Sequence, residues 1–380
     1  MGGNHVSGKA DNSKWILEEH TERKHRVLSY YLSIWSKILG ENNANLIYWD
    51  FFAGRGDYSE GEPGSPLIAM NISKERYESG NSLGRPISIT CVFIEEDKNC
   101  YYYLQNLLRD LYPDLEGDRW HLFHGDCQKK YDELQISEND SIFTKRIPQF
   151  FFLDPYGPIL PLEMLKRIMA KPRHEMILNF MVEWINRFTT DKIQENNLKA
   201  IFGVENLSVL RDIQVTENPI PNITEYYISR LMADDGARVK YVTRPFEMIP
   251  DRRQSTLYYI LGCTNNPLGI QKMSESMRAI SNNEDYSYRG KFEYQMTLEF
   301  LGRDKIKEIA DWVFENYIET EANFELIYTF CCGRQTWSRS EVRDAILQLE
   351  RNGKLVVQPK SGRKRVGNTF SDHTIVFQRE

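Results

Sequence analysis

Acidic residues at the ends of apolar runs are the side chains best placed to do chemistry. In chain order they are Asp50, Glu95 with Glu96, Asp126, and Asp154. Carboxylates at such positions can accept hydrogen bonds from ribose hydroxyls or from the amino group of a base. Their order predicts a nucleotide-like ligand at one edge of a sheet. Each acid taken singly is equally well explained as a solvated loop residue.

The most informative segment is IYWDFFAGRGDYSEGEPGSP, residues 47–66. Gly54 and Gly56 can provide the sharp turn and the close backbone approach that a nucleotide-like ligand needs after a strand. Ser65 is expected to cap the next helix, with Pro66 at its first position. A bare Gly-x-Gly also marks ordinary turns, so the prediction of a cofactor loop depends on the neighbouring acids.

The segment FFFLDPYGP, residues 150–158, is the candidate reaction centre. Four apolar residues lead directly to Asp154, so we expect its carboxylate at a buried sheet edge, where fixed partners give a polar group a defined role. Pro155 stiffens the turn, and Tyr156 offers a flat face on which a base can stack. The structural alternative is a simple turn, for which Asp-Pro-Tyr-Gly is a good formula.

Cysteine and histidine spacing gives no sign of a metal site. The six cysteines show no C-x-x-C spacing and mostly lie in apolar runs, so we expect reduced, packed thiols. His121 and His124 have no acidic or cysteine companions at ligand spacing, and no metal is predicted. No 18-residue apolar stretch exists and the first dozen residues are polar, so we expect a cytosolic protein with no membrane contact.

Short apolar runs alternate with helical segments, which predicts an α/β fold with a parallel sheet covered on both faces. The runs are 46–52, 87–94, 120–123, 149–153 and 176–180. A first amphipathic helix is expected over residues 15–39. Residues 239–248 and 256–263 are expected to pair antiparallel, because only a short polar turn separates them.

The length of 380 residues fits two domains. The predicted parts are a disordered tail (1–14), an α/β domain (15–280) with a helical insertion (186–237), a linker (281–300) and a second domain (301–380). In the second domain, two helical patterns (305–317 and 340–352) precede two strand patterns (355–357 and 374–377) around a basic turn. This order resembles a winged helix.

The net charge of −6 argues against a protein that coats nucleic acid by bulk attraction. Residues 333–367 nevertheless hold nine Lys or Arg against three acids, a local charge of +6 that leaves −12 for the rest. The basic turn contains Arg363, Lys364 and Arg365. A basic tip on an acidic body is expected if the tip captures a phosphate backbone, although solvated basic turns are also common.

Taken together, these segments resemble a known family. The element order, with Asp50 to Gly56, Glu95-Glu96, Gly125-Asp126 and Asp154-Pro155-Tyr156, looks like that of class I S-adenosylmethionine-dependent methyltransferases. More narrowly, the chain resembles the three-Cys-motif partner protein family, TcmP, over nearly its whole length. The matching segments are Lys24-His25 with YYLSIW, FFAGRGDY with GSPLIA, FFLDPYG, ILNF, and YYILGCTNNPLGIQKM.

The resemblance implies a Rossmann-like seven-stranded sheet with an antiparallel last strand, and a C-terminal winged helix-turn-helix. It implies S-adenosyl-L-methionine as the cofactor, in a site lined by Lys24, Asp50, Gly54, Gly56, Glu95 or Glu96, Asp126 and Cys127. Asp154 would hold the target amine, by kinship with enzymes that methylate adenine N6 in ribosomal RNA. Family members are also expected to work with a separate protein that bears a three-cysteine, radical-SAM-like motif.

The sequence departs from the methyltransferase pattern at one point. Amino-methyltransferases usually have Asp/Asn-Pro-Pro-Tyr/Phe, whereas here a single proline places Tyr156 one position early and Gly157 in the aromatic slot. The leading hypothesis is methyl transfer to a nitrogen of a base in RNA or DNA, without a covalent nucleophile. The alternatives are a catalytically silent nucleic-acid-binding or assembly subunit, and methylation of a protein or small molecule. The oligomeric state is not predicted.

Overall fold

The computed structural model describes residues 16–136, 147–155, 157, 160–250, 255–281, 287–288, 304–359, 367–371 and 373–378. The chain divides into two compact units. The first comprises Met1–Pro158 and Pro172–Ile177, and the second comprises Ile159–Lys171 and Leu178–Glu380. The predicted tail and nearly all of the predicted linker lie outside the described residues, so the predicted domain boundary stays a prediction.

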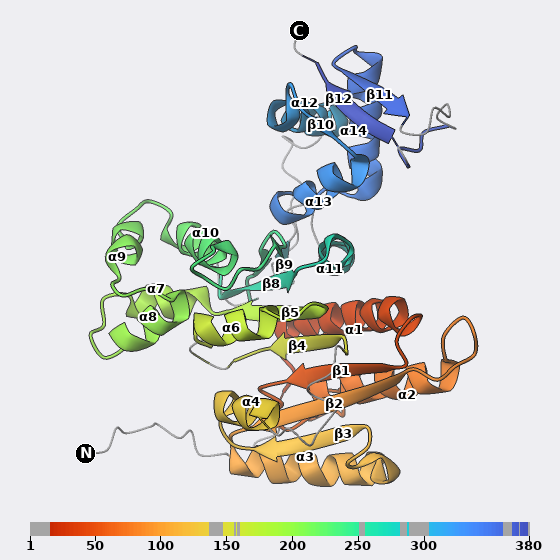
Figure 1. Cartoon of the computed structure of the whole chain (residues 1–380). Coiled ribbons are helices and arrows are strands. Elements are labelled where there is room, and N and C mark those ends of the chain that lie inside the picture. The colour runs from red at the N-terminus through yellow and green to blue at the C-terminus, as the bar shows by residue number, and fades with distance from the viewer. Residues whose placement is uncertain are drawn as a thin grey trace. The chain divides into compact units, whose positions relative to one another are not determined.

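The first unit is built on a parallel sheet (Figure 1). Its strands are β1 (Asn45–Asp50), β2 (Ser88–Glu95), β3 (Trp120–His124), β4 (Gln149–Leu153) and the beginning of β5 (His174–Phe180), in the order β3-β2-β1-β4-β5. β1 pairs in parallel with both β2 and β4, and β2 pairs in parallel with β3. β1 and β4 are buried almost throughout, as expected for strands covered on both faces.

The helices of the first unit are α1 (Glu19–Gly40), α2 (Ser65–Ser79), α3 (Lys98–Leu111) and α4 (Cys127–Ile136), with a 3₁₀ turn at Pro113–Leu115. α1 begins four residues later than the pattern predicted and packs its apolar face through Leu28, Leu32 and Trp35. The expected cap of α2 is wrong: Gly64 caps the helix, and Ser65 is its first residue. The hydroxyl of Ser65 hydrogen-bonds to Asp50 instead.

The second unit continues the sheet from β5, whose last residues belong to it, in the order β5-β8-β7-β9. Its strands are β6 (Tyr241–Val242), β7 (Phe246–Met248), β8 (Tyr258–Thr264) and β9 (Ser287–Tyr288). β6 and β7 both pair antiparallel with β8, which confirms the predicted hairpin. The described strands of this sheet number nine rather than the expected seven, because the sixth is split into β6 and β7 and because β9 pairs with β7.

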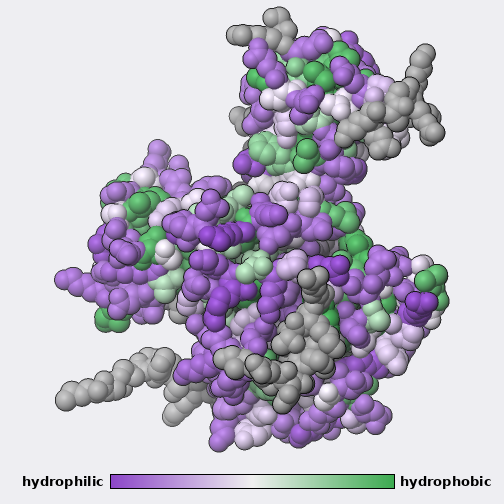
Figure 2. Space-filling view, in the orientation of Figure 1, coloured by the Kyte–Doolittle hydropathy of each residue, from purple (hydrophilic) through white to green (hydrophobic). Residues whose placement is uncertain are grey.

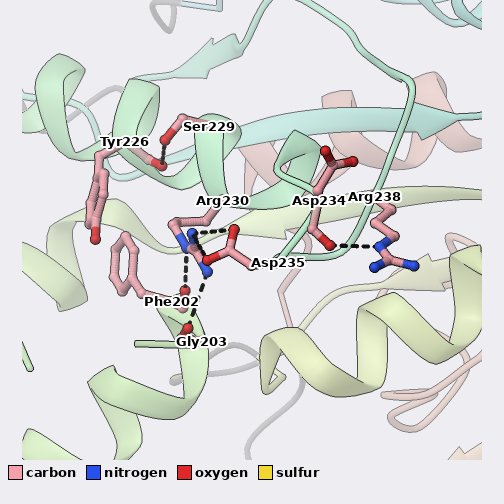
Figure 3. A network of polar contacts seen from close by, with 8 residues as sticks. All are labelled: Phe202, Gly203, Tyr226, Ser229, Arg230, Asp234, Asp235 and Arg238. Atoms are coloured by element: carbon pink, nitrogen blue, oxygen red, sulfur yellow. Dashed lines mark hydrogen bonds and ion pairs between the residues drawn. The ribbon is translucent and has the colours of Figure 1, made fainter. Parts of the chain in front are cut away.

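The helices around these strands are α6 (Leu162–Met169), α7 (Val182–Phe188), α8 (Glu195–Phe202), α9 (Ser208–Gln214), α10 (Pro219–Met232) and α11 (Pro267–Ile280). The segment predicted as a helical insertion, residues 186–237, contains the end of α7 and all of α8 to α10. Figure 3 shows how Arg230 of α10 ties it together, donating to the carbonyls of Phe202 (3.0 Å) and Gly203 (3.2 Å) and to the carboxylate of Asp235 (3.0 Å). These bonds satisfy carbonyls at the end of α8.

The C-terminal part of the second unit has its own core. It consists of α12 (Lys305–Tyr317), β10 (Glu321–Ala322), α13 (Phe324–Arg334), α14 (Arg339–Arg351), β11 (Leu355–Pro359) and β12 (His373–Phe377), with an antiparallel sheet in the order β10-β12-β11. A capping box between Ser338 and Glu341 starts α14. Ile270 of α11 packs into the same core.

None of the described helices is both long and apolar enough to cross a bilayer. On the face shown in Figure 2, hydrophilic residues predominate, and hydrophobic ones form scattered groups. All six cysteines are free and buried, as predicted.

Candidate active site

The predicted acids of the first unit gather at one edge of the sheet. Asp50 and Glu95 are the last residues of β1 and β2, and Asp154 directly follows β4. Since these strands are parallel neighbours, their carboxyl ends meet at the same edge. β1 lies between β2 and β4, so the chain leaves β1 at the point where the strand order reverses. Crevices at such switch points are where open α/β sheets bind ligands.

The loop after β1 needs both of its glycines. Gly54 and Gly56 adopt φ of 62° and 92°, values that residues with a side chain rarely tolerate. A Cβ on Gly56 would lie 2.6 Å from Cδ1 of Leu104, which is fully buried on α3. The loop closes on itself where the amide of Gly64 donates to the carbonyl of Gly56 at 2.7 Å. The sequence prediction of a special backbone turn here is confirmed.

Asp50 supports this loop from beneath. Its side chain is 0% exposed, so in this structure it does not reach a ligand. Its carboxylate accepts hydrogen bonds from the amide of Phe52 (3.2 Å), from the hydroxyl of Tyr48 (3.3 Å) and from Ser65. Burial raises the pKa of Asp50 to about 7, with a smaller upward contribution from the charge of Asp154. The residue therefore positions the glycine loop.

Glu95 fixes the other side of the loop. One carboxylate oxygen accepts from the amide of Gly54 at 2.6 Å, and the other accepts from the amide of Asp97 at 2.7 Å. Burial raises the pKa of Glu95 in spite of these bonds. The neighbouring Glu96 is exposed. Of the two predicted acids, Glu95 is thus engaged with the loop, and Glu96 presents its carboxylate to solvent.

Asp126 and Cys127 lie at the start of α4, near Glu96. Asp126 accepts from the amide of Lys129 at 3.0 Å and so caps the helix. Burial raises the pKa of the Cys127 thiol to about 12, and the charges of Asp126 and Glu96 act in the same direction. A thiol with this pKa is protonated at neutral pH, which agrees with a packing role and not with a nucleophile.

Lys24 and Asp154 form a largely buried ion pair. The ammonium nitrogen of Lys24 lies 2.5 Å from Oδ2 of Asp154, and their side chains are only 8% and 20% exposed. α1 therefore places Lys24, a predicted cofactor-binding residue, in contact with Asp154 of the candidate reaction centre. Pro155 is buried beside them. Tyr156, the third predicted catalytic residue, lies outside the described residues, as do Arg363, Lys364 and Arg365.

Sequence reasoning missed two residues of this centre, His25 and Tyr58. Their rings pack at a centroid distance of 5.8 Å and an angle of 52°. Burial lowers the pKa of His25 to about 3, the charge of Lys24 acts in the same direction, and that of Asp154 opposes it. Burial, then Asp154 and Asp50, raise the pKa of Tyr58. The only signal available in the sequence was the adjacency of His25 to Lys24.

A separate groove of about 1020 Å³ lies in the second unit. It is lined by residues of α10, of β6 to β8, and of α12 and α13. Three cationic and three acidic side chains face it: Lys240, Arg244, Arg334, Glu225, Glu247 and Glu321. Such a lining carries no net charge. Nowhere in the described part of the chain do three or more His, Cys, Asp or Glu residues gather in a way that could hold a metal ion.

No protein-family model matches the sequence, and no curated protein matches it. The resemblance to the TcmP family therefore stays a prediction. Among solved structures, 42 chains match.

Three of these structures illustrate the range. A protein from Legionella pneumophila has 14% identity and a TM-score of 0.37, with 70% of this chain and 93% of that chain covered. An O-methyltransferase from Bacillus cereus in complex with S-adenosylhomocysteine has 10% identity, coverage of 63% and 80%, and a TM-score of 0.33. Precorrin-6y C5,15-methyltransferase from Geobacter metallireducens has 8% identity, coverage of 67% and 96%, and a TM-score of 0.29. Likenesses this distant do not identify the activity of this chain.

Proposed function

We propose that this chain is an S-adenosyl-L-methionine-dependent methyltransferase that modifies a nitrogen of a nucleic-acid base. The observation that carries the proposal is the placement of the glycine loop and of Asp154 on either side of the switch point between β1 and β4. A ligand in that crevice would touch the loop on one side and Asp154 on the other. This is the arrangement needed to bring a cofactor and a target amine together.

The charge of the crevice favours a cationic cofactor over a dinucleotide. The edge carries Glu96, Asp126 and Asp154, while its buried cation, Lys24, is already paired. The amide of Gly54, which a dinucleotide site would offer to a phosphate, donates to Glu95. A pyrophosphate would meet repulsion here, whereas the sulfonium and ammonium groups of S-adenosylmethionine would be attracted.

The residues that would hold this cofactor follow from the same geometry. The glycine loop would lie against it, Glu96 is the free carboxylate for the ribose hydroxyls, and Asp126 with Cys127 would line the adenine end. Asp50 and Glu95 would act by holding the loop in shape. When bound, the cofactor supplies a methyl group on a sulfonium, which is already a good electrophile.

The protein's own task is then to place the amine and accept its hydrogens. The carboxylate of Asp154 would accept one amine hydrogen, in a position set by its ion pair with Lys24. Lys24 would fix the orientation of the carboxylate. Pro155, buried at the start of the turn, would stiffen the backbone on which Asp154 sits.

We further propose that residues 304–378 form a winged-helix domain that captures the nucleic acid. The order of α12, β10, α13, α14, β11 and β12 supports it, since α13 and α14 form a helix-turn-helix followed by a hairpin. The excess of basic residues over 333–367 supplies the charge for a phosphate backbone. The groove of the second unit is less suited to phosphate, because its three cations are matched by three acids. The three-cysteine-motif partner stays an expectation from the resemblance alone.

The second candidate function is a catalytically silent binding or assembly subunit. The ion pair that occupies Oδ2 of Asp154, together with the single proline, favours it. Calorimetric titration with S-adenosylhomocysteine tests the cofactor site, and transfer of tritium from labelled cofactor to total RNA or to genomic DNA tests turnover. We expect binding by the wild type, and label transfer that Asp154→Asn abolishes.

The matched control is Asp212→Asn, an exposed carboxylate on α9. Binding without transfer to either nucleic acid, with or without a co-expressed three-cysteine protein, would favour the silent subunit. Absence of cofactor binding would remove the methyltransferase proposal.

A further inference from the structure

The glycine loop after β1 is attached to α3 at two points. At the first, the amide of Gly54 donates to Glu95 at 2.6 Å, and Glu95 also accepts from the amide of Asp97, the N-cap of α3. At the second, Asp57 accepts a hydrogen bond at 3.0 Å from the hydroxyl of Tyr103, which lies in the second turn of α3. The second attachment involves residues that the proposed mechanism leaves unused.

The ring of Tyr103 contacts the loop as well. The guanidinium carbon of Arg55 lies 4.0 Å from the centroid of this ring, a distance at which a cation is attracted to an aromatic face. Between Arg55 and Asp57, the backbone of Gly56 comes so close to α3 that an added Cβ would lie 2.6 Å from Leu104. Three successive residues of the loop are therefore matched to Tyr103 and Leu104, two successive residues of α3.

The exposure of Tyr103 separates it from the core residues of α3. Its side chain is 40% exposed, whereas the next residue, Leu104, is fully buried. The preceding residue, Tyr102, is 51% exposed, and its ring packs within α3, at 5.2 Å from the ring of Tyr101 and 5.9 Å from Nζ of Lys98. Loss of the contacts of Tyr103 should therefore alter the loop more than the stability of the first unit.

We propose that Tyr103 is a positioning residue for the cofactor, because it holds Arg55 and Asp57 so that the glycine loop keeps the shape in which it binds S-adenosylmethionine. The inference rests on the proposed methyltransferase function and adds to it a residue of α3 that sets the affinity for the cofactor. Glycine restricts the backbone least, so the shape of a loop with Gly54 and Gly56 depends on the neighbours that hold it. A loop that is ordered before the cofactor arrives lowers the entropic cost of binding.

Two substitutions of Tyr103 separate its two contacts. Tyr103→Phe keeps the ring beside Arg55 and removes the hydroxyl, whereas Tyr103→Leu removes both. In calorimetric titrations with S-adenosylhomocysteine, Tyr103→Phe should weaken binding about fivefold, as expected for one hydrogen bond, and Tyr103→Leu about tenfold or more. Tyr102→Phe and Tyr102→Leu are the matched controls on the same helix, and they should bind like the wild type.

A double-mutant cycle tests whether the hydroxyl of Tyr103 acts through Asp57. Asp57→Ala removes the acceptor, so the addition of Tyr103→Phe to this variant should weaken binding no further. Asp57→Asn keeps an acceptor oxygen and should bind more tightly than Asp57→Ala. Additive losses from Asp57→Ala and Tyr103→Phe would mean that the two residues act independently, which would overturn the proposed contact.

Three further measurements distinguish positioning from a general loss of structure. Without cofactor, Tyr103→Leu should have the same thermal midpoint as Tyr102→Leu, but amide hydrogen exchange over residues 52–64 should be faster in Tyr103→Leu alone. With labelled cofactor and total RNA or genomic DNA as acceptor, Tyr103→Leu should raise KM for the cofactor. The maximal rate at saturating cofactor should stay unchanged, since Tyr103 acts on the cofactor loop and not on Asp154.

The outcomes distinguish the two levels of the proposal. If the wild type binds no S-adenosylhomocysteine, the proposed function fails, and the role of Tyr103 in cofactor binding fails with it. If the wild type binds the cofactor and Tyr103→Leu binds it with unchanged affinity, only the role of Tyr103 is overturned. A lower thermal midpoint together with a lower maximal rate would assign Tyr103 to the stability of the fold, and its positioning role would again be overturned.

Discussion

Replacing Asp50 with Asn should change how the stability of the first unit depends on pH. The carboxyl group is fully buried beneath the glycine loop, and its pKa is raised from 3.8 to about 7. A folded-state pKa above the unfolded value means that the folded state binds the proton more tightly. The resulting stabilisation is complete below pH 3.8 and is lost as the pH rises through about 7. Asn cannot titrate, so Asp50→Asn removes this dependence.

The magnitude follows from the width of that interval. Each pH unit is equivalent to 1.36 kcal/mol, so the interval from 3.8 to about 7 gives about 4 kcal/mol. His25 has the opposite sign, because its pKa falls from 6.5 to about 3 on folding and the unfolded state binds that proton. Between pH 3.8 and 6.5 the two proton differences cancel in the wild type. Removing Asp50 exposes the dependence of His25, and stability should then fall towards acid pH.

Urea unfolding at a series of pH values measures this effect. Tryptophan fluorescence follows the unfolding, and Trp35, Trp49 and Trp120 are its reporters in the first unit. The unfolding free energy of Asp50→Asn minus that of the wild type should rise by about 4 kcal/mol between pH 4 and pH 8. Groups that titrate in both proteins drop out of this difference. A change smaller than about 1 kcal/mol over that range would refute the claim that Asp50 is buried and protonated at mildly acidic pH.

Three further substitutions test separate parts of the structure. Gly56→Ala places a side chain at φ of 92°, against the buried Leu104. It should weaken S-adenosylhomocysteine binding at least about tenfold, as measured by calorimetry. Gly117→Ala is the control, because its φ is 78° but the space around it is open, and it should leave binding unchanged. Arg230→Met leaves two backbone carbonyls without their donor and should speed amide hydrogen exchange in the helical insertion, as seen by mass spectrometry. Ser338→Ala breaks the capping box of α14 and should destabilise the C-terminal part by about 0.5–2 kcal/mol in thermal unfolding.

Much of the fold could be predicted from local pattern. Apolar runs that alternate with helices, and the short turn before β8, determined the parallel sheet and its antiparallel end. α13 was missed because its sequence, FELIYTFCCGR, is apolar on several sides and shows no amphipathic period. The cap of α2 was placed one residue late, since Ser65 is a good capping residue by type. Its hydroxyl instead hydrogen-bonds to Asp50. Because Asp50 is 15 residues away in the sequence, the local sequence around Ser65 could not indicate this bond.

The acids of the site show where sequence reasoning stops. Pattern placed Asp50, Glu95 and Asp154 at one edge of a parallel sheet, and that placement is what the topology provides. The pattern did not show that Asp50 is buried and supports the loop. It also did not show that Glu95 accepts a hydrogen bond from the Gly54 amide, or that Asp154 pairs with Lys24 of α1. Each of these differences depends on a contact between residues distant in the sequence.

The net charge of the chain hides an uneven distribution of charged residues. The net charge of −6 is the sum of a basic segment, residues 333–367, and an acidic remainder. In the first unit part of that acidity stands at the crevice, where Glu96, Asp126 and Asp154 would repel the phosphate backbone as strongly as they attract a sulfonium. If the substrate is a nucleic acid, as we propose, its backbone must be bound away from the crevice, and only a base can enter it. An uncharged base can approach such a crevice, whereas a phosphate is repelled from it, so the proposed division between a basic capture surface and an acidic crevice follows from the charges.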